Sequence, residues 1–219
     1  MSKIESMCEI ITAKMEKELN LDANQKAVIQ YGLFAMIHTT LAIVLSVILG
    51  ILFGVLIPTL IICIAVIVLR KYSGGAHASN PEECMLIGIL VAVGGSLILT
   101  QVDWQISNIL IIGITTFLWA FYKVHQLVPV DSKAKPIKTK EKRLMLKKKS
   151  YFVLIIYIII VIGILIRYLQ IENQKYLIYI ASIYGGVIWE IFTLTMLGHL
   201  LIQKIDMLFN KLTHYKGGK

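Results

Sequence analysis

Long runs without a charged residue alternate with short polar segments along this chain. A transmembrane helix needs about 20 predominantly apolar residues to cross the hydrocarbon core of a bilayer. Four runs carry no Lys, Arg, Asp or Glu, and they cover residues 27–69, 84–102, 104–122 and 150–166. A fifth run, residues 176–203, contains a single acid, Glu190. The pattern predicts an all-α membrane protein in which each run forms at least one spanning helix.

The first run is about twice as long as one span. Gly50, Gly54 and Pro58 interrupt its middle, and glycine and proline mark turns between apolar segments. We therefore expect a hairpin of two helices over residues 31–50 and 52–69, which gives six spans in all. The composition agrees, because 57% of the residues are hydrophobic and the mean hydropathy is +0.76, more than a soluble domain needs.

The basic residues divide unequally between the two sides of a six-span chain. With a cytoplasmic N-terminus, 20 of the 22 lysines and arginines fall on the cytoplasmic side, and only Arg167 and Lys175 fall outside. Cytoplasmic segments of membrane proteins carry such an excess. The distribution predicts a multi-pass protein of the cell membrane with both termini in the cytoplasm. The formal net charge of +9 is then mainly a topology signal, and we expect no nucleic-acid partner.

The segments outside the spans divide the chain into three predicted parts. Residues 1–30 contain five acids, too many for a span or a signal peptide. Their apolar residues recur at helical spacing, at Ile4, Met7, Cys8, Ile11, Met15 and Leu19. We expect an amphipathic helix at the cytoplasmic interface or, alternatively, a helix packed against the protein's own loops. Residues 31–203 then form the membrane domain, and residues 204–219 form a basic cytoplasmic tail.

One of the three cysteines has the surroundings of a nucleophile. Cys63 lies within a span and Cys8 on the apolar stripe of the N-terminal helix. Cys84 follows "SNPEE", in which Ser79 or Asn80 caps a helix that begins at Pro81. A helix N-terminus favours the thiolate, which is the nucleophilic form of cysteine. Two neighbouring glutamates oppose that effect, so a base is still required.

His77, in the same polar loop (residues 70–84), is the candidate base. Asn80-Pro81 prevents a continuous helix between His77 and Cys84, and Gly74-Gly75 gives the loop freedom to fold back. A Cys–His pair for covalent catalysis is thus possible. The alternative is a loop histidine and a boundary cysteine without a catalytic role. The sequence contains no H-E-x-x-H, C-x-x-C, G-x-S-x-G or phosphate-binding-loop motif, so we expect neither a metal nor a cofactor.

Other polar residues have two interpretations each. Glu190 lies within the last span, where an ionisable group indicates either a functional site or a polar contact between helices. The basic loop at residues 123–149 contains membrane anchors, and part of it is also able to capture an acidic peptide. The candidates for that capture are Lys138, Lys140, Lys142 and Arg143.

The polar loop carries a recognisable pattern. R-x-x-x-G-G-x-H-A runs from Arg70 to Ala78, and Cys84 follows the histidine by seven residues, between two spans. This resembles the accessory gene regulator B (AgrB) family of membrane cysteine endopeptidases, which mature the autoinducing peptides of bacterial quorum sensing. The resemblance implies that His77 and Cys84 are catalytic, and that Arg70 and Gly75 match positions linked to activity.

The resemblance also implies a substrate and a reaction. The substrate is a short precursor peptide with an amphipathic leader and an acidic C-terminal tail, bound at the inner leaflet. Cleavage gives a thioester on Cys84, and ring closure gives a thiolactone, or a lactone if the precursor offers serine. The resemblance favours a homodimer in the lipid bilayer.

The alternative to a peptidase is a small transporter or exporter that uses Arg70, His77 and Glu190 for translocation.

Overall fold

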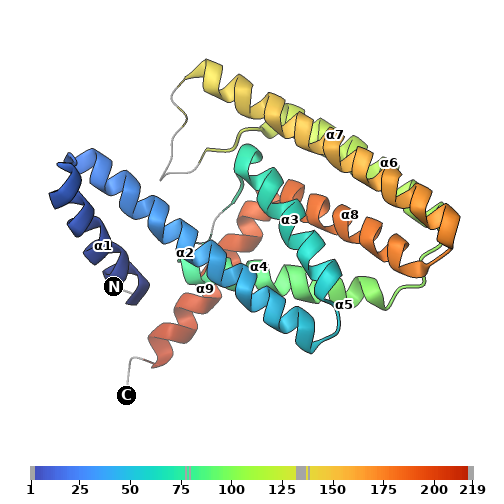
Figure 1. Cartoon of the computed structure of the whole chain (residues 1–219), viewed down its shortest axis with the longest axis horizontal. Coiled ribbons are helices and arrows are strands. Elements are labelled where there is room, and N and C mark those ends of the chain that lie inside the picture. The colour runs from blue at the N-terminus through green and yellow to red at the C-terminus, as the bar shows by residue number, and fades with distance from the viewer. Residues whose placement is uncertain (1–2, 77, 79, 132–136, 138, 217–219) are drawn as a thin grey trace. The chain divides into compact units, whose positions relative to one another are not determined.

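The computed structural model describes residues 3–76, 78, 80–131, 137 and 139–216, without the side chains of residues 210–216. These residues form helices joined by short connections (Figure 1). The N-terminal half contains α1 (Lys3–Leu19), α2 (Ala23–Leu52), α3 (Leu56–Ser73), α4 (Pro81–Ile89), a π-helical turn η1 (Leu90–Gly94) and α5 (Gly95–Thr100). The C-terminal half contains α6 (Ile106–Leu127), α7 (Lys140–Ile171), α8 (Gln174–Leu194) and α9 (Met196–Lys216).

Six of these helices are long and apolar enough to cross a membrane. They are α2, α3, α6, α7 and α8, together with the continuous helix Pro81–Thr100 that comprises α4, η1 and α5. The predicted all-α class and the six spans are confirmed, and the chain is a multi-pass membrane protein. The predicted break in the first run is also present, because the chain turns at Phe53 and Gly54 between α2 and α3.

The structure comprises two compact units, Met1–Leu45 and Ser46–Lys219. The first unit contains α1 and most of α2. Asp22 and Gln25 start α2 by a reciprocal cap, in which each side chain accepts a hydrogen bond from the other residue's backbone N–H. The predicted N-terminal helix is present as α1, and its place at the membrane interface stays a prediction.

Helix α8 is central to the second unit. In the most apolar 18-residue stretch of α8, 67% of the residues are buried, whereas in each of the other candidate spans the share is at most 33%. Helices α3, α6 and α7 all pack against it (Figure 1). Helix α3 lies close to α8 at Gly186, where an added Cβ would lie 2.6 Å from the Cβ of Ala65 in α3. This packing places the C-terminal end of α8 beside the end of α3, where the polar loop begins.

The last apolar run, residues 176–203, forms two helices. Thr195 has an extended backbone between α8 and α9, and its side chain accepts a hydrogen bond from the Gly198 amide (3.2 Å). This is a helix N-cap. A Cβ at Gly198 would lie 2.1 Å from the carbonyl oxygen of Phe192, so the sharp bend requires glycine there. Helix α9 includes most of the segment that the sequence predicted as a basic tail.

Candidate active site

The polar loop begins where α3 ends. Arg70 and Ser73 lie in the last turn of α3, and Gly74 and Gly75 follow with φ angles of 75° and 142°. These angles lie in the region that glycine adopts and other L-residues avoid. The two glycines therefore turn the chain sharply away from the axis of α3.

The glycines also lie against backbone and side-chain atoms from two other segments. The Val130 amide donates to the carbonyl oxygen of Ser73 (2.8 Å), and the Ala76 amide donates to the carbonyl oxygen of Thr193 in α8 (3.1 Å). A Cβ on Gly74 would lie 2.2 Å from the Val130 carbonyl oxygen, and one on Gly75 would lie 2.7 Å from Oγ1 of Thr193. The loop is thus held between α8 and the segment that follows α6.

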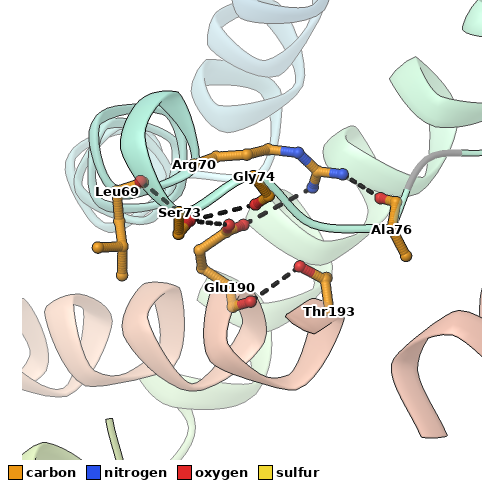
Figure 2. Close-up of polar contacts among 7 residues, drawn as sticks. All are labelled: Leu69, Arg70, Ser73, Gly74, Ala76, Glu190 and Thr193. Atoms are coloured by element: carbon orange, nitrogen blue, oxygen red, sulfur yellow. Dashed lines mark hydrogen bonds and ion pairs between the residues drawn. The ribbon is translucent and has the colours of Figure 1, made fainter. Parts of the chain in front are cut away.

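A buried carboxylate lies beneath this loop. The side chain of Glu190 is completely buried, and Figure 2 shows it reaching from α8 toward Arg70 and Ser73. The Ser73 hydroxyl donates to Oε1 of Glu190 (2.8 Å), and Nη1 of Arg70 forms an ion pair with Oε2 (3.7 Å). The other guanidinium nitrogen of Arg70, Nη2, donates to the carbonyl oxygen of Ala76 (Figure 2).

The structure therefore brings together three residues that the sequence had singled out separately, Arg70, Gly75 and Glu190. Two further participants, Ser73 and Thr193, were missed. Thr193 follows Glu190 by three residues, which places both on one face of a helix, and its hydroxyl donates to the Glu190 carbonyl oxygen (2.8 Å). That spacing was available in the sequence, but the contact with the loop was not.

The candidate base, His77, lies outside the described residues, as does Ser79. Its neighbour Ala76 is described, and both backbone groups of Ala76 are hydrogen-bonded, the amide to Thr193 and the carbonyl to Arg70. The pairing of His77 with Cys84 stays a prediction.

The candidate nucleophile, Cys84, is the fourth residue of α4 and is half-buried. The helix begins at Pro81, as predicted, with Asn80 at the N-cap position. The Asn80 side chain does not cap the helix, however, because it donates to the carboxylate of Glu83 (2.8 Å). Glu83 also forms a hydrogen bond with Asp206 of α9, which the sequence did not indicate. None of the three cysteines forms a disulfide among the described residues.

Three of the four basic candidates for substrate capture are described, and Lys138 lies outside the described residues. Lys140, Lys142 and Arg143 are exposed in the first turn of α7. Thr139 caps this helix by accepting from the Lys142 amide (3.3 Å), and Arg143 forms an ion pair with Asp131. Helix α7 starts well before the apolar run at residue 150, so these residues lie on a helical extension of the span.

Comparisons with known proteins identify the relatives of this chain. A family model described as "Accessory gene regulator B" matches residues 8–194. A relative from Clostridium perfringens (strain SM101 / Type A), named "Putative AgrB-like protein", is 38% identical over 95% of this chain and 99% of its own length. A second, from Clostridium perfringens (strain 13 / Type A) and named "Putative AgrB-like protein 2", is 36% identical over the same shares.

No solved structure matches the chain significantly, so the contacts around Glu190 have no solved counterpart among the matches. The family match spans most of the sequence, from α1 to the end of α8, and includes the whole polar loop. The chain therefore belongs to the accessory gene regulator B (AgrB) family.

Proposed function

We propose that the protein is a membrane cysteine endopeptidase that cleaves the C-terminal tail from a quorum-sensing precursor peptide and allows the remainder to cyclise. Membership of the AgrB family supports a role in autoinducer processing. The observation that carries the proposal is the anchored loop. The amide of Ala76, the residue before His77, is bound to α8 and its carbonyl to Arg70 of α3, and Cys84 lies in the first turns of α4, eight residues after Ala76.

The reaction begins with proton transfer. His77 accepts the proton of the Cys84 thiol, and the thiolate attacks a backbone carbonyl carbon of the precursor. Backbone N–H groups in the first turn of α4 donate to the oxyanion of the tetrahedral intermediate. The imidazolium of His77 returns the proton to the amine of the leaving tail. The products of this half-reaction are the free tail and an acyl-enzyme thioester on Cys84.

The second half-reaction closes the ring. A cysteine thiol within the bound precursor attacks the thioester carbonyl, and the Cys84 thiolate leaves. One thioester bond forms as another breaks, so the exchange is close to balanced in energy and requires no nucleotide. A serine in place of that cysteine would give a lactone.

The proposal includes an orientation for the site. The excess of lysine and arginine predicts that the polar loop, the basic segment and both chain termini face the cytoplasm. The precursor leader then lies on the inner leaflet, and its acidic tail meets Lys138, Lys140, Lys142 and Arg143. We also propose that the protein acts as a homodimer.

The contacts of Arg70 and Glu190 do not favour the alternative function as a transporter, because both side chains bind the protein's own loop.

The decisive test is cleavage of the peptide encoded beside this gene, with each cysteine replaced in turn. We expect Cys84→Ser and His77→Ala to reduce cleavage by at least about 1,000-fold, the scale on which a nucleophile and its base contribute. Cys8→Ser and Cys63→Ser are the matched controls and should retain most activity. Substantial cleavage by the Cys84→Ser protein would exclude a cysteine peptidase.

A further inference from the structure

The burial of Glu190 inside a membrane helix costs free energy, so its presence there requires an explanation. It is completely buried on α8, the most buried of the spans, and an ionisable side chain inside a membrane helix is expensive unless it is paired. Helix packing alone does not require it. The contact between α3 and α8 is already made by apolar side chains and by the close approach of Gly186 to Ala65.

The Glu190 carboxylate has polar partners at the end of α3, where the polar loop begins. Oε1 accepts from Ser73, the last residue of α3, and would lie 3.4 Å from a Cβ added to Gly75. Oε2 accepts no hydrogen bond within the described part of the chain, and its counter-charge is the guanidinium of Arg70. The carboxylate is therefore the charge that holds Arg70 in place.

Arg70 connects the Glu190 carboxylate to the polar loop. Its other guanidinium nitrogen donates to the carbonyl oxygen of Ala76, the residue directly before His77. The same residue is bound from the opposite side, because its amide donates to Thr193, one turn after Glu190 on α8. Both backbone polar groups of Ala76 are thus bound, the carbonyl through Arg70 and Glu190 and the amide through Thr193.

We propose that Glu190 is a positioning residue for the cleavage reaction, which acts through Arg70 on the Ala76 peptide and thereby on catalysis by the next residue in the chain, His77. This inference rests on the proposed function. The effect of Glu190 is on the geometry of proton transfer. Displacement of a reacting group by about 1 Å costs on the order of 100-fold in rate.

The test is Glu190→Gln, which keeps the volume of the side chain and an acceptor for Ser73 but removes the charge that holds Arg70. We expect kcat for precursor cleavage to fall on the order of 10- to 100-fold with KM within about twofold of the wild-type value. Glu190→Asp keeps the charge and should recover part of that loss. Ser182→Ala is the matched control, because Ser182 is fully buried on the same helix and its hydroxyl donates to the Ile178 carbonyl oxygen of that helix (2.7 Å).

Coupling is measured by a double-mutant cycle between Arg70→Gln and Glu190→Gln. If the two residues act as one unit, the double variant should cleave within about threefold of the slower single variant, whereas independent effects would multiply. If Glu190→Gln does not accumulate, Ser73→Ala removes one contact of the carboxylate and should lower kcat by a smaller factor. Wild-type kcat in every one of the Glu190 and Ser73 variants that accumulates overturns the inference.

A second readout separates positioning from loss of stability. In protein lacking Cys8 and Cys63, the rate of Cys84 alkylation by iodoacetamide at neutral pH reports whether a base is near the thiol. Glu190→Gln should slow alkylation in the same direction as His77→Ala but by a smaller factor, while the detergent-solubilised protein stays monodisperse. Wild-type alkylation with impaired cleavage would overturn the inference. An active Cys84→Ser protein would instead remove the proposed function, so the two failures are distinguishable.

Discussion

The hydroxyl of Ser73 donates a 2.8 Å hydrogen bond to the carboxylate of Glu190, although 117 residues separate the two in the chain. This contact joins the last residue of α3 to the interior of α8. It fixes the point at which the polar loop leaves the membrane-spanning helix. The first part of the loop, up to Ala76, therefore has three attachments, to Glu190, Thr193 and Val130, and is not simply a connection between spans.

The attachments predict that the two loop glycines do not tolerate a side chain. Gly74→Ala and Gly75→Ala each combine a strained φ angle with a Cβ closer than 3 Å to a neighbouring atom. We expect either change to reduce precursor cleavage by at least about 10-fold by displacing the loop from its productive position. Gly163→Ala is the control, because Gly163 lies in α7 with nothing within 4 Å of an added Cβ.

Cleavage is measured with membranes that contain equal amounts of each variant. Gly163→Ala should retain wild-type activity, since alanine is a better helix residue than glycine. Wild-type cleavage by Gly75→Ala would contradict the close contact between Gly75 and Thr193.

The topology is tested by labelling single engineered cysteines with an impermeant maleimide in protein that lacks Cys8, Cys63 and Cys84. Ser73 is not a suitable position, because it is completely buried. Lys71 and Lys140 are exposed, and cysteines there should react only after the cells are opened. Cysteines at the exposed positions Gln105 and Asn173 should react in intact cells. The reverse pattern would overturn the orientation derived from the basic residues.

The basic segment is tested by replacing Lys138, Lys140, Lys142 and Arg143 with Gln together. If these residues capture an acidic tail, the apparent KM for the precursor should rise several-fold at low salt. The difference should shrink at high salt, because exposed charges are screened beyond about 8 Å at physiological ionic strength. Arg167 and Lys175, which the topology places outside, provide the control: the variant with both replaced by Gln should keep the wild-type KM.

An unchanged KM in the quadruple variant at low salt would show that these four basic residues do not capture the precursor tail and act only as determinants of topology. The remaining lysines of the segment would then be sufficient to hold it on the cytoplasmic side. Maleimide labelling of each variant confirms that its orientation is unchanged before the kinetics are compared.

The fold was largely predictable from the sequence, because membrane spans are specified by local composition. The six spans and the start of α4 at Pro81 follow from apolar runs and from proline chemistry. The break after Leu194 was not predicted. It depends on the Thr195 cap and on the close approach of Gly198 to Phe192, inside a run whose composition alone is continuous and apolar.

The candidate site was only partly predictable. The motif identified Arg70, Gly75 and Cys84, and the membrane location identified Glu190, but no local pattern linked the last residue to the others. Their contact depends on how α3 packs against α8. Thr193 was missed for the same reason, since it is an ordinary polar residue in the sequence and acquires significance only through its carbonyl contact with Ala76.

The most direct measurement of the central claim is the mass of the enzyme during turnover. A precursor whose cyclising cysteine is replaced by alanine can be cleaved but cannot close the ring, so the acyl-enzyme should accumulate. Intact-protein mass spectrometry should then show an added mass equal to that of the N-terminal fragment less one water, removable by hydroxylamine and absent from Cys84→Ala. Release of the tail without any such adduct, or the same adduct on Cys84→Ala, would contradict catalysis through a thioester on Cys84.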